Sequence, residues 1–394
     1  MLPTIESRHP APARPVVGRI AELDGVRGMA MLLVIMWHYF AGTVQTQPGS
    51  LAAYGMKMLS LTWAGVDLFF VLSGFLIGGI LLDNRTAPNF FQAFYVRRFC
   101  RIFPLYYLMF GLFLAALAAG LGDEGGGFAW LFGDPLPLWS YATYFQNFTS
   151  AISGSHGPNW MGITWSLAIE EQFYVVLPLL VRFVPARTLP WLLAVLVLGA
   201  PLLRGALFLW HPHAGLPGYV LLPARWDALF LGVLGAWAMR RDDARIWLAA
   251  HTKVIRALVV VCTLVTLGLL AKSQSIGSAG MSFFGHTVLA FMSLGLVLLS
   301  LLSREGVVAT IFRQPVLVWL GTVSYGVYLF HQPVHGLMHA AFRNQAPQIA
   351  GWADAGVTLL ALAGTLGLAV VSWRWFERPI VQLGQRVNYR GSPA

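Results

Sequence analysis

The chain has 394 residues, of which 57% are hydrophobic and only 11% charged, and its formal net charge is +10. Because charged residues make up about a quarter of ordinary soluble domains, this composition excludes a typical soluble enzyme or nucleic-acid-binding module. Apolar runs recur from residue 28 to residue 376, with connections mostly too short to form a separate core. A single polytopic membrane domain is therefore predicted.

Helices of about 17–25 mostly apolar residues are long enough to cross a membrane. No stretch shows the ten-residue alternation of an outer-membrane barrel, so helices are expected. We predict an all-α fold with about ten transmembrane helices around a polar channel. The spans are expected at residues 28–46, 61–82, 102–121, 167–185, 188–209, 224–240, 254–272, 283–302, 314–338 and 355–376, and the membrane domain at 21–380, with tails at 1–20 and 381–394.

Positive charge is predicted to gather on one side of the membrane. With a cytoplasmic N-terminus, twenty of the 26 Lys and Arg residues fall in inside segments; only Lys57, Arg204, Arg225, Lys272 and Arg343 fall outside, and Arg27 belongs to the first helix. This asymmetry predicts two cytoplasmic termini. A bacterial inner (plasma) membrane is the expected location. The first 20 residues lack the pattern of a cleavable signal peptide. The two cysteines are expected to be free thiols. The last dozen residues are expected to be disordered.

One long outside connection, residues 122–166, is rich in aromatic side chains. They fit an interfacial belt or a surface that stacks against an acceptor sugar. The aromatic residues concerned are Trp130, Trp139, Tyr141, Tyr144, Phe145, Trp160 and Trp165.

Arg27 and His38 stand eleven residues apart in the first span. Eleven residues are close to three helical turns, so the two side chains share a face about 16 Å apart along the axis. Ionisable groups at this depth usually face a protein interior or a water-filled cavity. We expect a polar channel that leads from Arg27 to His38, where an imidazole can accept and return a proton; snorkelling of Arg27 and a structural hydrogen bond of His38 are the alternative.

Asp67 lies near the start of the second span, where Ser73 and Gly74 allow a neighbouring helix to approach closely. Asp67 is expected either to orient His38 or to pair with Arg225.

In a loop before Pro104, Arg97, Arg98 and Arg101 form a cluster. Their guanidinium forks suit the oxygens of a bound phosphate. Alternatively, the cluster sets the membrane orientation of the chain or contacts anionic lipid.

Adjacent carboxylates, Glu170 and Glu171, enter the fourth span beside Ser166, Gln172 and Tyr174. Adjacent residues face different ways on a helix, so one should face the cavity and the other should pair elsewhere. Arg225 and Asp227 are expected together at the outer membrane edge, as an orienting pair or as a charge couple at a helix end.

His331, His335 and His339 follow one another at four-residue spacing, but Pro333 interrupts the turn and no carboxylate or cysteine completes a set. No metal is therefore expected. His331 is expected to be a hydrogen-bonded histidine at the outer mouth of the cavity.

Together these segments resemble the acyltransferase-3 family of integral membrane acyltransferases. The resemblance rests on LDGVRG with a histidine eleven residues after its arginine, GVDLFFVLSGFLI, RRFCRIFPLYYL, WSLAIEEQFY, RWDAL, SYGVYLFHQPV and FERP, in the expected order over about residues 20–380. It implies transfer of an acyl group, commonly acetyl, from cytoplasmic acyl-CoA to a hydroxyl of a glycan or similar acceptor across the membrane.

The resemblance also implies residue roles. Arg27 and His38 match the family's essential pair, and Arg98 and Arg101 match its proposed acyl-CoA contact. With CoA phosphates on the three arginines, His38 is expected either to deprotonate the acceptor or to be acylated itself. Glu170 or Glu171 would orient or deprotonate the acceptor from the outer side, with Asp67 or His331 in support.

Several alternatives stay open at this point. Some family members carry an additional C-terminal esterase-like domain; this chain ends soon after FERP, so transfer is expected within the membrane domain or through another protein. The first expectation for the acceptor is a sugar of an O-antigen, exopolysaccharide or capsule, free or lipid-linked; peptidoglycan, a Nod-factor-like oligosaccharide and a hydrophobic natural product such as a macrolide follow. A transporter or lipid flippase would also place charges in a channel, but it should show paired broken helices in repeated halves, and no repeat is found. A sensor that binds acyl-CoA without turnover is the third possibility. Membrane lipids are expected partners, and nucleic acid is not.

Overall fold

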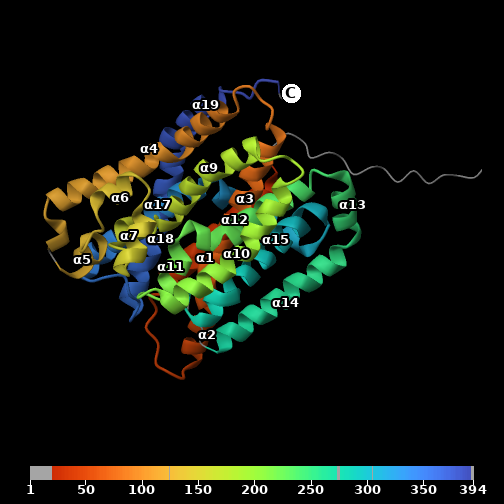
Figure 1. The fold of residues 1–394 in the computed structure, drawn as a ribbon. Coiled ribbons are helices and arrows are strands. Elements are labelled where there is room, and N and C mark those ends of the chain that lie inside the picture. Colours follow the sequence, from red (N-terminus) through yellow and green to blue (C-terminus); the bar gives the residue numbers. More distant parts are fainter. Residues whose placement is uncertain (1–19, 124, 273–275, 304, 392–394) are drawn as a thin grey trace, which may run out of the picture.

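The protein is described by a computed structural model that covers residues 20–123, 125–272, 276–303 and 305–391. In these residues the chain is helical, and the only strand-like pairing is an isolated bridge between Val44 and Ile349. In Figure 1 the long helices α4, α9, α10 and α14 run in a common diagonal direction. The α-helices are α1 (Ala21–Met36), α2 (Leu51–Leu59), α3 (Gly65–Asp83), α4 (Phe90–Ala118), α5 (Gly126–Phe132), α6 (Leu138–Ala142), α7 (Gln146–Ser153), α8 (Asn159–Gly162), α9 (Trp165–Phe183), α10 (Leu189–Trp210), α11 (Gly215–Val220), α12 (Trp226–Ala238), α13 (Asp242–Ala250), α14 (Thr252–Ala271), α15 (His286–Leu302), α16 (Val307–Phe312), α17 (Pro315–Arg343), α18 (Trp352–Ser372) and α19 (Arg378–Gln385).

Each of the ten predicted spans falls on a helix, which confirms the all-α fold. Within the described residues, six helical stretches are long and apolar enough to cross a membrane: Leu51–Asp83, Phe90–Ala118, Leu189–Trp210, Thr252–Ala271, Met281–Leu302 and Trp352–Gln385. The predicted number of ten is therefore not established. The other four predicted spans lie on α1, α9, α12 and α17, of which α12 has only 13 residues.

Contacts between helix ends show that α1 runs parallel to α17 and that α3 runs parallel to α12. At one end of the bundle the starts of α1 and α17 meet through Glu22 and Arg313, 2.5 Å apart, and the ends of α3 and α12 meet through Asp83 and Arg240, 2.6 Å apart. At the other end, the Ile349 amide donates to the Thr43 carbonyl at 2.9 Å. The first end, rich in arginine, is called the basic end below. The predicted tail at 1–20 lies outside the described residues except for Ile20, as do Arg8, Arg14, Arg19 and Arg304 of the charge count.

Helices α3 and α12 touch backbone to backbone. A Cβ atom on Gly74 would lie 1.9 Å from the Leu229 carbonyl oxygen, and one on Gly232 would lie 2.1 Å from the Val71 carbonyl oxygen. Only glycine allows this distance, as small residues do in membrane helix pairs. The close approach predicted at Gly74 is thus confirmed.

Three helical stretches widen into π-helix: η1 (Trp37–Ala41) after α1, η5 (Met281–Gly285) before α15, and η6 (Trp373–Glu377) after α18. A π turn holds an additional residue, so it rotates the side chains that follow relative to the preceding helix. His38 lies in η1. Its direction therefore differs from the one that the regular three-turn spacing from Arg27 predicts.

Two predicted boundaries are wrong. The arginine cluster was expected in a loop before Pro104, but α4 begins at Phe90 and includes Pro104. The charged first half of α4 lies beside a cavity, and its arginines lower the mean hydropathy from which the start of the span was predicted. The tail expected from residue 381 is also absent up to residue 391, since α19 continues to Gln385 and the following residues pack against α4. Residues 392–394 lie outside the described residues.

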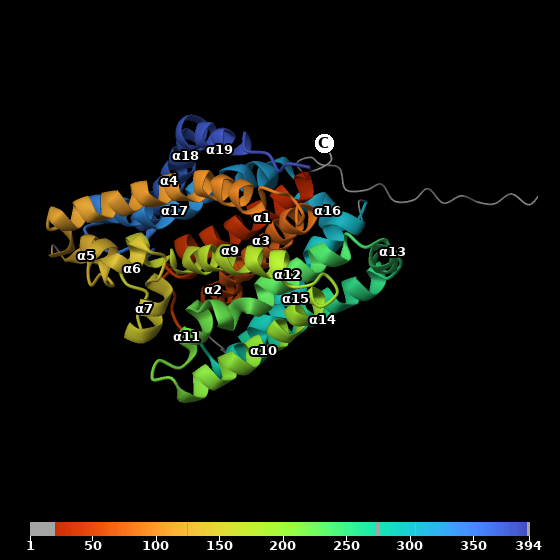
Figure 2. The ribbon, with the colours of Figure 1, turned by 45° about the horizontal axis from the view of Figure 1, so that its top comes forward.

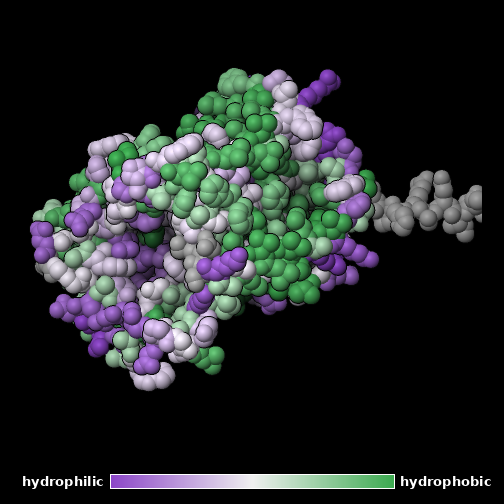
Figure 3. All heavy atoms as spheres, turned by 60° about the horizontal axis from the view of Figure 1, so that its bottom comes forward, coloured by the Kyte–Doolittle hydropathy of each residue, from purple (hydrophilic) through white to green (hydrophobic). Residues whose placement is uncertain are grey.

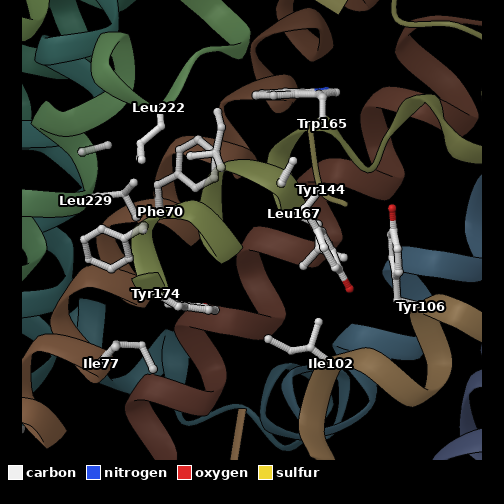
Figure 4. Close-up of a cluster of buried hydrophobic side chains, with 14 of the residues drawn as sticks. Phe70, Ile77, Ile102, Tyr106, Tyr144, Trp165, Leu167, Tyr174, Leu222 and Leu229 are labelled. Carbon is white, nitrogen blue, oxygen red and sulfur yellow. The ribbon is translucent and has the colours of Figure 1, made fainter. Parts of the chain in front are cut away.

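The long connection at 122–166 folds into short helices, and most of its aromatic side chains point inward. Tyr141, Tyr144, Trp160 and Trp165 are buried, whereas Trp139 and Phe145 remain exposed. The Tyr144 ring stacks on Tyr106 of α4 with centroids 4.4 Å apart, as Figure 4 shows. Neither an interfacial belt nor a sugar-stacking surface describes this set, because its members mainly form the core between the connection and α4.

The molecular surface separates by polarity. Figure 3 shows apolar side chains over a broad continuous part of one face and polar side chains gathered around its margins. Large apolar residues exposed on α10 and α14 include Trp191, Leu198, Leu202, Val260 and Leu264. An apolar surface of this kind on long hydrophobic helices identifies an integral membrane protein.

Candidate functional site

A cavity of about 600 Å³ lies among α1, α3, α4, α9, α17 and the C-terminal residues. Ile77, Ile102, Leu167 and Tyr174, which are labelled in Figure 4, belong to its lining. Its volume is within the range of about 300–1,000 Å³ that small-molecule sites occupy. Its polar lining includes Asp24, Arg27, Ser73, Arg97, Arg98, Arg101, Ser166, Glu170, Tyr174, Tyr325, Tyr328, Gln385 and Tyr389.

Four arginines from two helices line this cavity, and each has a different environment. Arg27 pairs with Asp24, one turn earlier in α1, at 2.9 Å. The Arg98 guanidinium lies 5.8 Å from the Tyr174 ring, and that of Arg101 lies 5.1 Å from the Trp373 ring. The Arg97 guanidinium instead hydrogen-bonds residues near the C-terminus. The structure thus brings Arg27, Arg97, Arg98 and Arg101 together around one cavity at the basic end, whereas Arg225, which the sequence also singled out, does not line it.

His38 lines a second, smaller chamber of about 50 Å³, together with Trp63, Trp165 and Tyr219. The chamber and the large cavity share three lining residues, Val66, Ser166 and Tyr328. The Tyr328 hydroxyl donates to the Ile163 carbonyl and lies 2.8 Å from the Ser166 hydroxyl. A hydrogen-bonded pair, Ser166 and Tyr328, therefore forms the partition between the arginine-lined cavity and the histidine.

The hydrogen bonds of His38 fix the role of each ring nitrogen. His331 Nδ1 lies 2.6 Å from the Tyr328 carbonyl oxygen, which only accepts, so in the neutral ring His331 Nδ1 carries the proton and Nε2 is an acceptor. His331 Nε2 lies 3.1 Å from His38 Nδ1, which also lies 3.1 Å from the Val34 carbonyl oxygen. His38 Nδ1 therefore carries the proton, and His38 Nε2 keeps its lone pair.

The two glutamates separate as adjacent helical residues should. Glu170 lines the large cavity and interacts electrostatically with Arg98 and Arg27, so it does have basic neighbours. Glu171 does not line the cavity, and its Oε1 is buried without a hydrogen-bond partner among the described residues. The glutamates were expected on the outer side with the acceptor. Glu170 instead lies on the arginine side of the partition.

Ser73 and Tyr174 connect two walls of the cavity, of which one, α9, also carries Glu170. Their hydroxyl oxygens are 2.9 Å apart, joining α3 to α9. Gln172 faces away from the cavity and donates to the Tyr144 carbonyl at 2.8 Å.

Asp67 pairs with Arg225, and both side chains are fully buried. Of the two readings of Asp67, the structure shows the ion pair with Arg225 and no contact with His38 in the described residues. Asp227 pairs with Arg204 at 2.8 Å, also fully buried, and accepts from Thr287 at 2.6 Å. The expected pair of Arg225 with Asp227 is wrong, because each bonds a partner on another helix; both ion pairs lie within the bundle.

The histidines of α17 are all buried, and only His331 contacts His38. His331 was expected at the outer mouth of the cavity, but it lies directly beside His38. The His335 ring stacks on Tyr39 with centroids 4.1 Å apart, and His339 Nε2 lies 2.9 Å from the Thr358 hydroxyl. Among the described residues no group of three or more His, Cys, Asp or Glu side chains could hold a metal.

The sequence reading missed Tyr325 and Tyr328, which line the cavity on α17. Both precede His331 at three-residue spacing, so a helical reading of the same segment could have placed the three on one face. It also missed Trp373 and Tyr389, which lie far along the chain from α4; no local pattern marks them.

Comparisons with known proteins give a consistent family. A family model described as an acyltransferase domain, of the acyltransferase-3 type, matches residues 20–374. The chain is 28% identical to a peptidoglycan O-acetyltransferase of Listeria monocytogenes, over 94% of this chain and 57% of that protein. It is also 28% identical to a Bacillus subtilis protein provisionally named a peptidoglycan O-acetyltransferase, over 93% of this chain and 56% of that protein. The chain thus spans less than two thirds of these relatives. No solved structure matches it.

Proposed function

The chain belongs to the acyltransferase-3 family, and from this premise we propose that it transfers an acetyl group from acetyl-CoA to a hydroxyl of a cell-wall glycan, with peptidoglycan as the first candidate acceptor. The family match covers most of the chain. The names of the Listeria and Bacillus relatives support the acceptor.

One observation carries the proposal: an imidazole with an available lone pair lies one hydrogen-bonded partition away from a cavity lined by four arginines. Cationic side chains in a cavity of this size suit the phosphates of CoA. The lone pair on His38 Nε2 suits proton abstraction or acyl acceptance. The proposed donor site at Arg27 and the proposed base, His38, thus follow one another along α1 and η1.

The reaction then balances as follows. The carbonyl carbon of the thioester loses its bond to sulfur and gains one to the acceptor oxygen, and the hydroxyl proton passes to the CoA thiolate by way of His38 Nε2. The His331 imidazole accepts from His38 Nδ1–H, so it holds the ring in the required tautomer and supports the positive charge that protonation creates. The thioester reaches His38 by displacing the Ser166–Tyr328 pair.

In this proposal the basic end faces the cytoplasm, where acyl-CoA is made. The excess of Lys and Arg in segments at that end supports the orientation. Both termini would then be cytoplasmic, in the plasma membrane of a bacterium.

The test uses purified full-length protein in detergent or vesicles, with acetyl-CoA and soluble peptidoglycan fragments. Free CoA and acetylated fragment should appear in equal amounts. Binding of acetyl-CoA without release of CoA would indicate a sensor, and movement of a glycan lipid between leaflets without acetyl-CoA consumption would indicate a flippase; either result would contradict the proposal.

A further inference from the structure

The C-terminal residues extend the wall of the large cavity. The π segment η6 turns the chain at the end of α18, and α19 then lies along the first half of α4, as both ribbon views show (Figures 1 and 2). The contact is close, because a Cβ atom on Gly384 would lie 2.8 Å from the Cys100 Cβ atom. Val381, Gln385 and Tyr389 line the cavity beside the arginines of α4.

Residues 387–390, here called the C-terminal strap, are tied to α4 by reciprocal hydrogen bonds. Arg97 donates from Nε to the Val387 carbonyl and from Nη2 to the Asn388 side-chain oxygen, each at 2.9 Å. Asn89, directly before α4, donates to the Asn388 carbonyl at 2.9 Å and accepts from the Arg390 amide at 2.8 Å. Arg97 therefore holds the strap in place, which distinguishes it from Arg98 and Arg101.

Tyr389 is the aromatic residue that this strap adds to the cavity. Its side chain is nearly buried, with 9% exposure, and the Arg97 guanidinium lies 5.2 Å from its ring. Its hydroxyl is buried without a hydrogen-bond partner among the described residues. A buried hydroxyl normally has a partner, so its position on a cavity wall points to one supplied by a ligand.

We infer that the C-terminal strap binds the adenine nucleotide part of the CoA donor, with Tyr389 against the base and ribose and with Arg97 as a positioning residue. This inference rests on the proposed function. Of the parts of acetyl-CoA, only the nucleotide combines an aromatic ring, hydroxyls and several phosphates, and the strap places an aromatic ring and an unpaired hydroxyl next to Arg98 and Arg101. Aromatic side chains bind bases in this way without a hydrogen-bond code.

The experiment compares two donors, acetyl-CoA and acetyl-pantetheine, which lacks the nucleotide. In Tyr389→Ala the KM for acetyl-CoA should rise about tenfold or more, the range that loss of one base-stacking contact gives, with kcat unchanged and the KM for acetyl-pantetheine unchanged. Gln382→Ala is the matched control, because Gln382 is exposed on α19 and does not line the cavity. Adenosine 3′,5′-bisphosphate should inhibit the unchanged protein with acetyl-CoA and should inhibit Tyr389→Ala less.

Equal losses with both donors, or no change with either, would overturn the assignment while leaving acyl transfer intact. If Tyr389→Ala does not fold, Asn388→Ala, which removes only a tether of the strap, gives the same comparison. Failure of the unchanged protein to consume acetyl-CoA at all would instead refute the proposed function, and this inference with it.

Discussion

His38 and His331 come from helices 293 positions apart in sequence, and their 3.1 Å contact sets the chemistry of the site. The sequence identified both histidines but placed His331 at the outer mouth, because no local pattern reports which residues of α17 face α1. The structure shows what His331 does: its Nε2 accepts the hydrogen bond that His38 Nδ1–H donates. A residue that orients a catalytic base acts on turnover and not on donor binding.

Replacing His331 with alanine should therefore lower kcat, by up to about 10⁴-fold as when the partner that orients a catalytic histidine is changed, and leave the KM for acetyl-CoA nearly unchanged. His213→Ala serves as the control, since His213 is exposed and its ring hydrogen-bonds a surface carbonyl, that of Ile152, at 3.0 Å. Steady-state measurement of CoA release separates the two constants. A rise in KM with unaltered kcat would show that His331 belongs to the donor site.

Tyr328 forms the partition with Ser166, and its hydroxyl makes both bonds that keep it closed. Tyr328→Phe keeps the ring and removes these bonds, so water should gain access to the thioester. We expect CoA release to exceed acetylated product in this variant, by comparison with the one-to-one ratio of the unchanged protein. A parallel fall of both products would mean that the hydroxyl has a structural role only.

Element by element, the apolar runs of the sequence correctly predicted where helices occur, because length and hydrophobicity decide insertion into lipid. The predicted start of the third span was wrong, because Arg97 and Arg101 lie inside α4. A charge that faces an internal cavity is compatible with a helix, although a hydropathy average excludes it. The π turn at His38 could not be predicted, since tertiary packing selects it.

The buried pair Asp67–Arg225 connects α3 to the start of α12, where the two helices touch backbone to backbone. Asp67→Asn would leave Arg225 uncompensated in the bundle, and removing one partner of a buried pair costs about 3–5 kcal/mol. Thermal unfolding in detergent should show this as a clear drop in midpoint. The exposed pair Arg241–Asp243 gives the control, because solvent screens it and Asp243→Asn should leave the unfolding midpoint almost unchanged. Equal, small effects in both variants would contradict a structural role for the buried pair.

For the molecule as a whole, the charge asymmetry predicts the orientation of the bundle, and the structure supplies positions that test it. Asp243 is exposed near the basic end, and Asp134 is exposed in the long connection between α4 and α9. In a protein whose Cys100 and Cys262 are replaced by alanine, a membrane-impermeant thiol reagent added to intact cells should label Asp134→Cys and not Asp243→Cys. The reverse labelling would place the arginine-lined cavity outside and remove its access to cytoplasmic acyl-CoA.

At this scale the sequence supported the fold class and family well, and the arrangement of the site only partly. It identified the arginines, His38 and Glu170, which do line adjoining cavities. It placed Glu170 on the wrong side of the partition and treated the C-terminal residues as a tail, because both features depend on contacts between distant segments. The close approach of residues 387–390 to α4 is visible only in three dimensions.

The most direct test of the account is turnover by His38→Ala, measured together with acetyl-CoA binding in the same purified preparation. His38 lines the small chamber and not the large cavity, so the variant should bind acetyl-CoA with unchanged affinity. Product formation should fall by at least about 100-fold, the smallest factor usual for loss of a general base. Undiminished acetylation by a stable His38→Ala protein would contradict the central claim that this imidazole performs the transfer.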